Sequence, residues 1–394
     1  MNQKIILCLV AAIFMVGGVV SCKKTEPLAS YRVGVVVAQT GEYAGLGLQA
    51  MEGMQLVADE INAAGGVDGV PLELVIYDDK SQATEAALAA KKLIEVDKVH
   101  ILAAASATGP SMSLVPVANE SEVPTVILTG TTLQDDKLGA WVFRPTGTEA
   151  SYVTLDLEYL SQELGLSKYA TLIENSAFGE GGKVFLPQMS PDCDLAIVAE
   201  QFFDPGATDL APQLTNIKNS EAEAIFLWGG TTAAVLAVKQ AREMGISLPI
   251  VGTPPNVAPN LVKEFGQYFE MEPSFVASTS KFDVWQQLAD TDPDKAAYRE
   301  FAEAFIARYE HPASMWGVLG GQFIRFIEDG LKRANAELLD LEAARSQIRN
   351  ALEETDHLQL YTGVYTMSPQ DHFGQTEWRM VLVTFKDGEI VLVP

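Results

Sequence analysis

Hydroxyl side chains follow two apolar segments of the chain, at points where strands are expected to end. Ser106 and Thr108 lie in the sequence SATGPS directly after one apolar run, and Thr129 and Thr131 lie directly after the next. A loop of hydroxyls and backbone N–H groups that opens a helix can hold a carboxylate at the positive end of that helix. These two loops therefore predict a binding site for a small polar molecule. The alternative is that the hydroxyls only cap helices.

The sequence contains none of the common catalytic or metal-binding motifs. Its 4 histidines lie far apart, without the HExxH or CxxC spacing of zinc sites. It lacks the Gly-x-Ser-x-Gly turn of serine hydrolases. The glycine-rich segments near Gly45 and Gly179 do not have the spacing of nucleotide-binding loops. We therefore expect no metal, no cofactor and no enzymatic activity.

Alternating strands and helices are expected to position these loops. The predicted strands are 32–38, 72–77, 101–105, 125–128, 169–173, 195–201, 224–228 and 249–252, with a terminal hairpin of 380–385 and 390–393. The predicted helices are 45–64, 84–96, 111–120, 152–164, 179–186, 210–219, 232–244, 294–309, 315–334 and 341–353. This alternation predicts an α/β fold with parallel sheets covered by helices. In such sheets, ligands bind beyond the carboxyl ends of the strands.

The first 22 residues have the composition of an export signal. Lys4 precedes an uncharged apolar run from Ile5 to Val20, and the sequence VVSC then ends at Cys22. The length of the run fits a signal peptide better than a membrane-spanning helix. The sequence VVSC resembles the lipobox of bacterial lipoproteins, in which the cysteine is lipidated. We therefore predict lipidation of Cys22 and a tether over 23–30. An ordinary signal peptide and a retained membrane helix are the alternatives.

Charge and cysteine content exclude several other classes of protein. The chain of 394 residues has a net charge of −25, from 27 basic and 52 acidic residues. Such a surface repels nucleic acids and anionic lipids, so we expect no nucleic-acid partner and membrane contact only through the lipid anchor. With Cys8 removed and Cys22 lipidated, Cys193 is left without a disulfide partner. The adjacent Asp192 and Asp194 predict a raised pKa for the Cys193 thiol.

Several segments of the chain share their order and spacing with one known family. These segments are VGVVVAQTGEYAGLG (33–47), ADEINAAGGVDG (58–69), YDDKS (77–81), VPTVILTGT (123–131), FR (143–144), FG (178–179) and PGATD (205–209). Together they resemble the type I periplasmic binding proteins related to the leucine/isoleucine/valine-binding protein. The resemblance covers essentially the whole chain after the tether.

The resemblance implies two doubly wound parallel-sheet lobes, joined by three hinge crossovers, with the ligand held between the lobes. Breaks in the strand–helix alternation agree with crossovers near Pro145, Ser278 and Tyr361. The predicted first lobe is 31–145 plus 279–360, and the predicted second lobe is 146–278 plus 361–394.

The resemblance also implies which residues contact the ligand. Ser106, Thr129 and Thr131 of the first lobe would hold its carboxylate and amine. The full set of predicted ligand-binding residues is Tyr43, Ser106, Thr108, Thr129, Thr131, Phe178, Thr231 and Asn256, with Trp316 as a further aromatic near the cleft. For Tyr43 and Trp316, packing in the core is the alternative.

One position departs from the branched-chain amino acid binders. The sequence GTPPN places Pro254 where those proteins carry a glutamate that pairs with the ammonium group of the ligand. Leaving a desolvated ammonium without an anion costs on the order of several kcal/mol. Either another acid, such as Asp204 or Asp283, replaces this glutamate, or the ligand is not an α-amino acid.

These features predict the solute-binding lipoprotein of an ABC importer. We expect a monomer, held outside the cytoplasm, that delivers an amino acid, an amide or a short carboxylate to permease subunits. A sensor that signals to a separate membrane receptor is the alternative, and an enzyme built on the same fold is a third possibility. The variants Ser106→Ala and Thr131→Val are expected to lose ligand binding while the unliganded melting temperature stays nearly unchanged.

Overall fold

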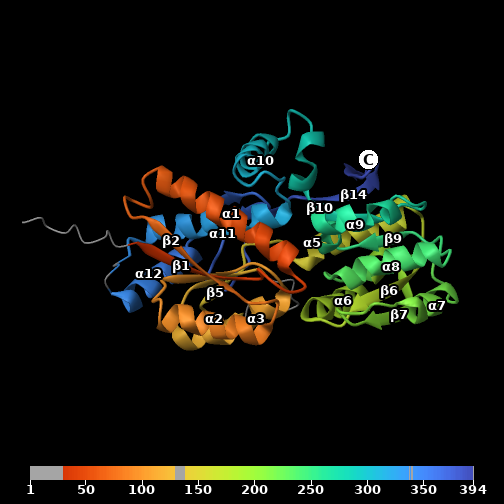
Figure 1. Cartoon of the computed structure of the whole chain (residues 1–394), viewed down its shortest axis with the longest axis horizontal. Coiled ribbons are helices and arrows are strands. Elements are labelled where there is room, and N and C mark those ends of the chain that lie inside the picture. The colour runs from red at the N-terminus through yellow and green to blue at the C-terminus, as the bar shows by residue number, and fades with distance from the viewer. Residues whose placement is uncertain (1–29, 129–137, 337, 339, 394) are drawn as a thin grey trace, which may run out of the picture.

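Two sheets lie side by side along the long axis of the molecule in the computed structural model (Figure 1). The structure describes residues 30–128, 138–336, 338 and 340–393. The first sheet is 5-stranded and parallel, in the order β2-β1-β3-β4-β5. Its strands are β1 (Tyr31–Val37), β2 (Leu72–Asp78), β3 (Ile101–Ala104), β4 (Thr125–Ile127) and β5 (Val142–Phe143). The strand order changes direction between β1 and β3, so loops that follow these two strands flank a crevice suited to a ligand.

Helices cover both faces of the first sheet because its strands are apolar on both sides. One face carries α1 (Ala44–Ala63), α11 (Met315–Ala334) and α12 (Leu341–Glu353), and the other carries α2 (Ala83–Glu95) and α3 (Thr108–Ser121) (Figure 1). Glycines let α1 and α11 approach closely, since a Cβ atom at Gly53 would lie 1.8 Å from the carbonyl oxygen of Gly317.

The second sheet is 7-stranded, in the order β15-β14-β10-β9-β8-β6-β7. Its strands are β6 (Lys168–Glu174), β7 (Ala196–Phe203), β8 (Ala224–Trp228), β9 (Ile250–Gly252), β10 (Val276–Ser280), β14 (Met380–Lys386) and β15 (Glu389–Leu392). The helices on one face are α5 (Glu149–Glu158) and α6 (Ala177–Met189), and those on the other are α7 (Ala211–Lys218), α8 (Thr232–Glu243) and α9 (Pro259–Phe269). The predicted α/β class with two parallel sheets is therefore confirmed, with an antiparallel hairpin at one edge.

The chain passes between the two sheets three times, after β5, after β10 and before β14. Between the last two passages lie α10 (Lys295–Tyr309), α11, α12 and a small antiparallel sheet of β11 (Leu358–Leu360), β12 (Gly363–Tyr365) and β13 (Gln375–Trp378). The division of the chain into lobes at 145/146, 278/279 and 360/361 stays a prediction.

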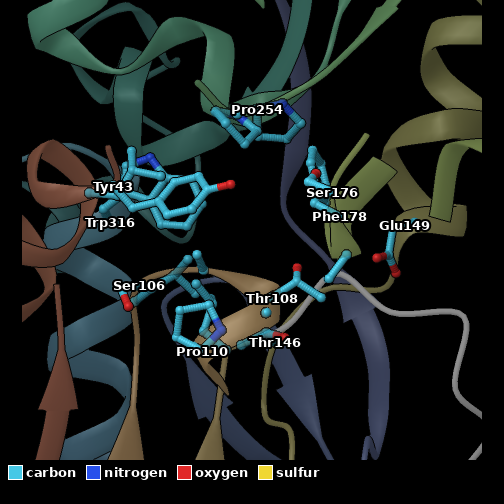
Figure 2. A pocket seen from close by; sticks show the side chains of 18 of the residues that line it. Tyr43, Ser106, Thr108, Pro110, Thr146, Glu149, Ser176, Phe178, Pro254 and Trp316 are labelled. Atoms are coloured by element: carbon cyan, nitrogen blue, oxygen red, sulfur yellow. The ribbon is translucent and has the colours of Figure 1, made fainter. Parts of the chain in front are cut away.

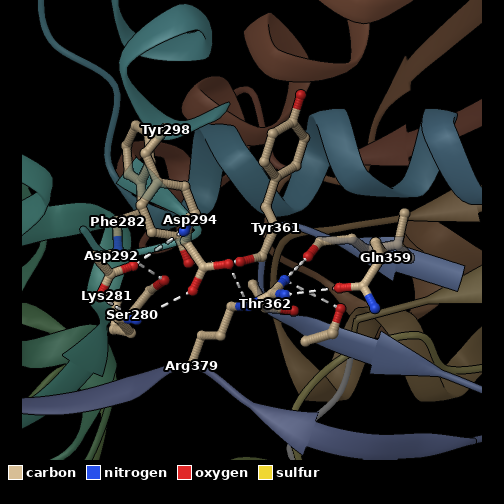
Figure 3. Close-up of polar contacts among 12 residues, drawn as sticks. Ser280, Lys281, Phe282, Asp292, Asp294, Tyr298, Gln359, Tyr361, Thr362 and Arg379 are labelled. Atoms are coloured by element: carbon tan, nitrogen blue, oxygen red, sulfur yellow. Dashed lines mark hydrogen bonds and ion pairs between the residues drawn. The ribbon is translucent and has the colours of Figure 1, made fainter. Parts of the chain in front are cut away.

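One carboxylate ties two of these passages together (Figure 3). Asp294 accepts from Nζ of Lys281, which follows β10, at 3.0 Å and from Nε of Arg379, which precedes β14, at 2.9 Å. Lys281 also pairs with Asp292 at 2.8 Å. Arg379 donates further to Oε1 of Gln359 at 2.9 Å. The four charged side chains are mostly buried, so the network fixes the geometry of the connection more firmly than surface ion pairs would.

Several predicted element boundaries differ from those observed. Helix α3 begins at Thr108 rather than at residue 111. Pro110 is tolerated in its first turn, because backbone N–H groups in the first turn have no acceptor within the helix. Strand β10 has the sequence VASTS, which lacks a long apolar run, and it was not predicted. Strands β5, β11, β12 and β13 and helix α9 were also not predicted, and the strands among them are only two to four residues long.

The N-terminal predictions concern residues that the structure does not describe. The predicted signal, with Cys22, and the tether up to residue 29 lie outside the described residues. Within the described ranges, no helix combines the length and the apolar character needed to cross a membrane. Cys193 is half-buried. Burial and the carboxylates of Glu158, Asp192 and Asp194 raise the pKa of its thiol, so the predicted direction of this shift is confirmed.

Candidate functional site

A cavity of about 360 Å³ lies between the two sheets. Its walls come mainly from the segments that follow β1, β3 and β4 of the first sheet and β6, β7, β8 and β9 of the second sheet, together with residues of α5 and α11. It therefore lies beyond the carboxyl ends of strands in both sheets, where an open α/β sheet binds ligands. The residues that line it include Glu42, Tyr43, Ser106, Thr108, Gly109, Glu149, Tyr152, Glu174, Phe178, Gly230, Pro254 and Trp316.

Aromatic side chains form two opposing walls of the cavity. Figure 2 shows Tyr43 and Trp316 on one side, with the Tyr43 hydroxyl pointing into the cavity, and Phe178 on the other side. Trp228 supports Phe178 from behind, because its Nε1 donates to the Phe178 carbonyl oxygen at 2.9 Å. Burial raises the pKa of the Tyr43 phenol well above its ordinary value, and the nearby carboxylates of Glu174 and Glu42 add to this shift. Tyr43 is therefore a neutral hydroxyl at physiological pH.

Ser106 lines the cavity where β3 gives way to α3. Its hydroxyl donates to Oδ2 of Asp79 at 2.8 Å, and both side chains are buried. Burial raises the pKa of Asp79, while the hydrogen bonds from Ser106 and the backbone of Ser81 oppose that rise. Because its proton is engaged by Asp79, the Ser106 hydroxyl can offer a ligand lone pairs but no donor.

The N-terminus of α3 faces the same cavity. Ala107 at the N-cap provides no side-chain hydrogen bond to the helix, and Thr108 and Gly109 of the first turn line the cavity. The dipole of this 14-residue helix favours a negative group at this end. Here α3 of the first sheet lies close to α6 of the second sheet, since a Cβ atom at Gly109 would lie 3.8 Å from the Cβ atom of Ala177 in α6.

Glu174 ends strand β6 and is fully buried in the cavity wall. Its Oε2 accepts from the backbone N–H groups of Gly230 and Thr231, both at 3.2 Å, and from the Thr231 hydroxyl at 2.6 Å. The carboxylate is thus held rigidly by one oxygen, and the Tyr43 phenol interacts with the same carboxylate through its charge and a side-chain hydrogen bond.

A second buried acid, Glu149, begins α5 and also lines the cavity. Its Oε2 lies 3.7 Å from Nη1 of Arg144, and each side chain is 1% exposed. Burial raises the pKa of Glu149 to about 7, although the Arg144 charge opposes this shift. The hydroxyl of the neighbouring Tyr152 has no hydrogen-bond partner among the described residues. This corner of the cavity can therefore exchange a proton near neutral pH.

The structure brings four of the predicted residues together around one cavity: Tyr43, Ser106, Thr108 and Phe178. The further aromatic Trp316 lines it as well. Its buried Nε1 has no partner among the described residues, which makes it an available donor. Thr129 and Thr131 lie outside the described residues. The ligand-binding roles of all these residues stay predictions.

Two predicted residues lie behind the cavity wall instead of lining it. Thr231 is buried, and its hydroxyl is bonded to Glu174. Asn256 is fully buried in a capping box, where its Oδ1 accepts from the backbone N–H of Thr253 at 2.8 Å and its Nδ2 donates to the Gly229 carbonyl oxygen at 2.9 Å. Both side chains thus shape the wall through neighbouring residues.

Neither acid named as a replacement for the missing glutamate lines the cavity. Asp204 is exposed and accepts from the Asn175 amide at 3.1 Å. Asp283 is half-buried, accepts from the backbone N–H of Met315 at 2.7 Å, and has its pKa raised to about 6 by desolvation. Sequence reasoning missed Glu174, although its place at the end of an apolar strand resembles that of Ser106 and would have pointed to it.

Comparison with known proteins identifies the family of this chain. Residues 30–389 match the family described as periplasmic binding protein. An amino acid binding protein of Pseudomonas aeruginosa is 25% identical over 57% of this chain, and the match spans 60% of that relative. A Leu/Ile/Val-binding protein homolog 7 of Brucella abortus is 22% identical and matches 93% of this chain and 91% of its own length.

Among solved structures, an extracellular ligand-binding receptor from Rhodopseudomonas palustris HaA2 has a TM-score of 0.85 at 22% identity, covering 93% of this chain and all of that one. This likeness shows the fold. The family match, together with a cavity enclosed between two doubly wound sheets, confirms the resemblance derived from the sequence. This chain therefore belongs to the periplasmic binding protein family, whose members bind small solutes outside the cytoplasm.

Proposed function

We propose that this protein is the solute-binding lipoprotein of an ABC importer, which captures an amino acid, an amide or a short carboxylate between its two sheets. The observation that carries the proposal is the cavity itself, which both sheets build and aromatic side chains wall. A small molecule contacts both halves of the cavity fully only when the two sheets and their helices have closed around it. Ligand binding therefore favours the closed form. A permease can then distinguish the closed, loaded form from the open one.

The relatives support an amino acid as the class of ligand to test first. The Pseudomonas aeruginosa relative is described as an amino acid binding protein, and the Brucella abortus relative as a Leu/Ile/Val-binding protein homolog. The size of the cavity, about 360 Å³, lies within the range of pockets that enclose small ligands. The N-terminus of α3 is suited to a ligand carboxylate.

The proposed place of action is the outer side of a bacterial membrane, with Cys22 as the lipid attachment site and 23–30 as the tether. Expression of the full chain with Cys22→Ser tests this. The variant is expected to leave the membrane fraction, whereas the parent stays in it. Unchanged membrane retention of the variant would contradict the anchor.

Mass spectrometry of the protein purified under native conditions tests solute binding. We expect a co-purified small molecule, and we expect the same compound to stabilise the protein by about 2.7 kcal/mol at a hundredfold excess over its Kd. Absence of any retained molecule, together with no stabilisation by amino acids, amides or short carboxylates, would contradict the proposal. Membrane co-purification with a permease then separates the importer from other binding roles.

A further inference from the structure

Glu149 lies where the wall of the cavity meets the first passage of the chain between the sheets. It begins α5 of the second sheet, a few residues after β5 of the first sheet ends at Phe143. It also lines the cavity, and Figure 2 shows it on the Phe178 side, opposite Tyr43. This acid therefore connects the cavity with a segment that joins the two sheets.

An ion pair spans this first passage. Nη1 of Arg144, just before the passage, lies 3.7 Å from Oε2 of Glu149, just after it, and each side chain is 1% exposed. This distance is longer than that of a well-formed hydrogen bond between charged groups, so the pair compensates only part of the cost of burying the carboxylate. The backbone N–H of Arg144 donates to the His372 carbonyl oxygen at 2.8 Å, and its guanidinium carbon lies 4.2 Å from the centre of the Phe373 ring. The pair is thus also packed against the segment that leads to the third passage.

The helices around Glu149 bring buried acidic groups or small residues close to it. On α5 itself, Tyr152 and Asp156 follow at one and two turns along the helix, and both are buried. On α6, Gly181 faces Glu149, since a Cβ atom at Gly181 would lie 3.6 Å from Oε1 of the carboxylate. None of these groups can balance the charge of an ionised Glu149.

The strands and the cavity wall near Glu149 do not balance its charge either. Strands β10 and β14 pack against α5, but β10 has no ionisable residue, and the one in β14, Lys386, ends the strand and is exposed. The cavity wall carries two further acids, Glu42 and Glu174. Among the described residues, Arg144 is the only cation that acts on the pKa of Glu149.

The two sheets and their helices are closed over the cavity in this structure. A Cβ atom at Gly45 in α1 would lie 2.9 Å from Oδ1 of Asn260 in α9, so a helix of the first sheet touches a helix of the second. In this closed form the Glu149 side chain has almost no contact with water. Because it lines the cavity, opening of the cavity would expose its carboxylate to water.

This change of surroundings alters the affinity of Glu149 for a proton. Burial raises the pKa of Glu149 to about 7 in the closed form. A glutamate in contact with water has a pKa of about 4.3. Between these two values the closed form binds a proton that the open form releases, so the closed form is favoured as pH falls and loses this advantage as pH rises above about 7.

We propose that closing of the cavity is coupled to the uptake of a proton by Glu149, and that Arg144 sets the pH at which this happens. The proton comes from the solvent and returns to it on opening. This inference goes beyond the proposed function, because it concerns the movement of the two sheets with or without a solute. Between pH 8 and pH 6 the ratio of closed to open form is expected to rise about tenfold.

Two measurements on the parent protein test this coupling. Small-angle X-ray scattering of the ligand-free protein at pH 6 and pH 8 reports its shape. Calorimetry at the same pH values reports the affinity for the amino acid, amide or short carboxylate that stabilises the parent most. A smaller radius of gyration or about tenfold tighter binding at pH 6 is expected. If neither quantity changes, or if both change in the opposite direction, the inference is overturned.

A variant of Glu149 assigns the effect to this residue. Glu149→Gln does not titrate, so the differences between pH 6 and pH 8 are expected to disappear. The matched control is Glu264→Gln, an exposed acid of α9, which is expected to keep the pH dependence of the parent. Full pH dependence in Glu149→Gln would overturn the inference, since another acid such as Asp283, with a pKa of about 6, would then be responsible.

A variant of Arg144 tests the second part of the proposal. Arg144→Gln removes the positive charge that opposes the rise in the pKa of Glu149. The midpoint of the pH dependence is therefore expected to move to higher pH, and an unchanged midpoint would overturn the role given to Arg144. The measurements on the parent decide whether closing depends on pH even where a variant fails to fold.

Failure of this inference and failure of the proposed function are distinguishable. If no compound binds the parent, the proposed function is wrong, but scattering of the ligand-free protein still decides whether its shape depends on pH. If a compound binds equally well at both pH values and the shape does not change, the proposed function stands and the coupling is wrong.

Discussion

The Ser106 hydroxyl donates to Oδ2 of Asp79 across 2.8 Å, and both side chains are buried. This contact alters the expectation for Ser106→Ala, which the sequence alone predicts to leave the unliganded protein nearly unchanged in stability. The variant leaves a buried carboxylate oxygen without its donor, which costs about 1–3 kcal/mol. We therefore expect a lower free energy of unfolding in urea as well as weaker ligand binding.

The matched control for this prediction is Ser113→Ala in α3, the helix that follows Ser106. The Ser113 hydroxyl donates only to the nearby Pro110 carbonyl oxygen, at 2.7 Å, and the residue is partly exposed. We expect a loss below about 1 kcal/mol, because a local neutral hydrogen bond contributes little on balance. Equal stability losses in the two variants would show that the hydrogen bond from Ser106 to Asp79 contributes no more to stability than the local bond of Ser113.

The stability of the protein is expected to depend on the protonation of Glu149. Burial raises the pKa of Glu149 to about 7 in the folded state, above the value of about 4.3 for an unperturbed glutamate. Between these two values the folded state binds more protons than the unfolded state, so the free energy of unfolding falls as pH rises through this window. Below the window the contribution of Glu149 is fully present, and above about pH 7 it is lost.

Urea unfolding of the parent and of Glu149→Gln at pH 5 and pH 8 checks this sign. The variant does not titrate at this position, so its stability should fall less between the two pH values than that of the parent. Other acids with raised pKa values, such as Asp79 and Asp283, are common to both proteins and cancel in the comparison. The same fall in both proteins would exclude a raised pKa at Glu149.

Arg379 is expected to stabilise the connection between the two sheets. Replacement by methionine removes the pairing with Asp294 at 2.9 Å and the bond to Gln359, and it leaves the mostly buried Asp294 carboxylate short of a donor. We expect a loss of about 1–3 kcal/mol in urea unfolding. The control is Lys168→Met, whose pair with Glu221 is more exposed and should contribute less to stability. A smaller loss for Arg379→Met than for the control would contradict the role of this network (Figure 3).

Alanine substitution of two glycines, in helices that cover the second sheet, is expected to change the stability of the protein in opposite directions. A Cβ atom at Gly182 in α6 would lie 2.7 Å from the Trp228 ring, so Gly182→Ala should destabilise the protein by about 1–3 kcal/mol through overpacking. A Cβ atom at Gly266 in α9 would meet nothing within 4 Å. Gly266→Ala should therefore stabilise the protein by about 0.5–1 kcal/mol. Thermal unfolding of both variants checks these signs, and a stabilising Gly182→Ala would contradict the packing of Trp228 against α6.

The sequence by itself determined the class of fold and the ends of the strands at which the cavity opens. Apolar runs between amphipathic helices require parallel sheets, and such sheets collect ligands beyond their carboxyl ends. Helices α11 and α12 have the predicted boundaries because their amphipathic periodicity is long and uninterrupted. Short or polar strands such as β5 and β10 were missed, since their pairing depends on neighbours that are distant in sequence.

Only the tertiary structure decided which side chains face the cavity and which support it from behind. Thr231 and Asn256 follow strand ends just as Ser106 does, yet only Ser106 lines the cavity, whereas the other two lie behind its wall and are bonded to Glu174 and to the Gly229 carbonyl oxygen. Glu174 is a carboxylate among many in an acidic chain, and it is distinguished by complete burial and by the three donors from Gly230 and Thr231 that converge on its Oε2. Burial and hydrogen bonding are set by contacts between residues far apart in the chain, so periodicity and local motifs do not contain them.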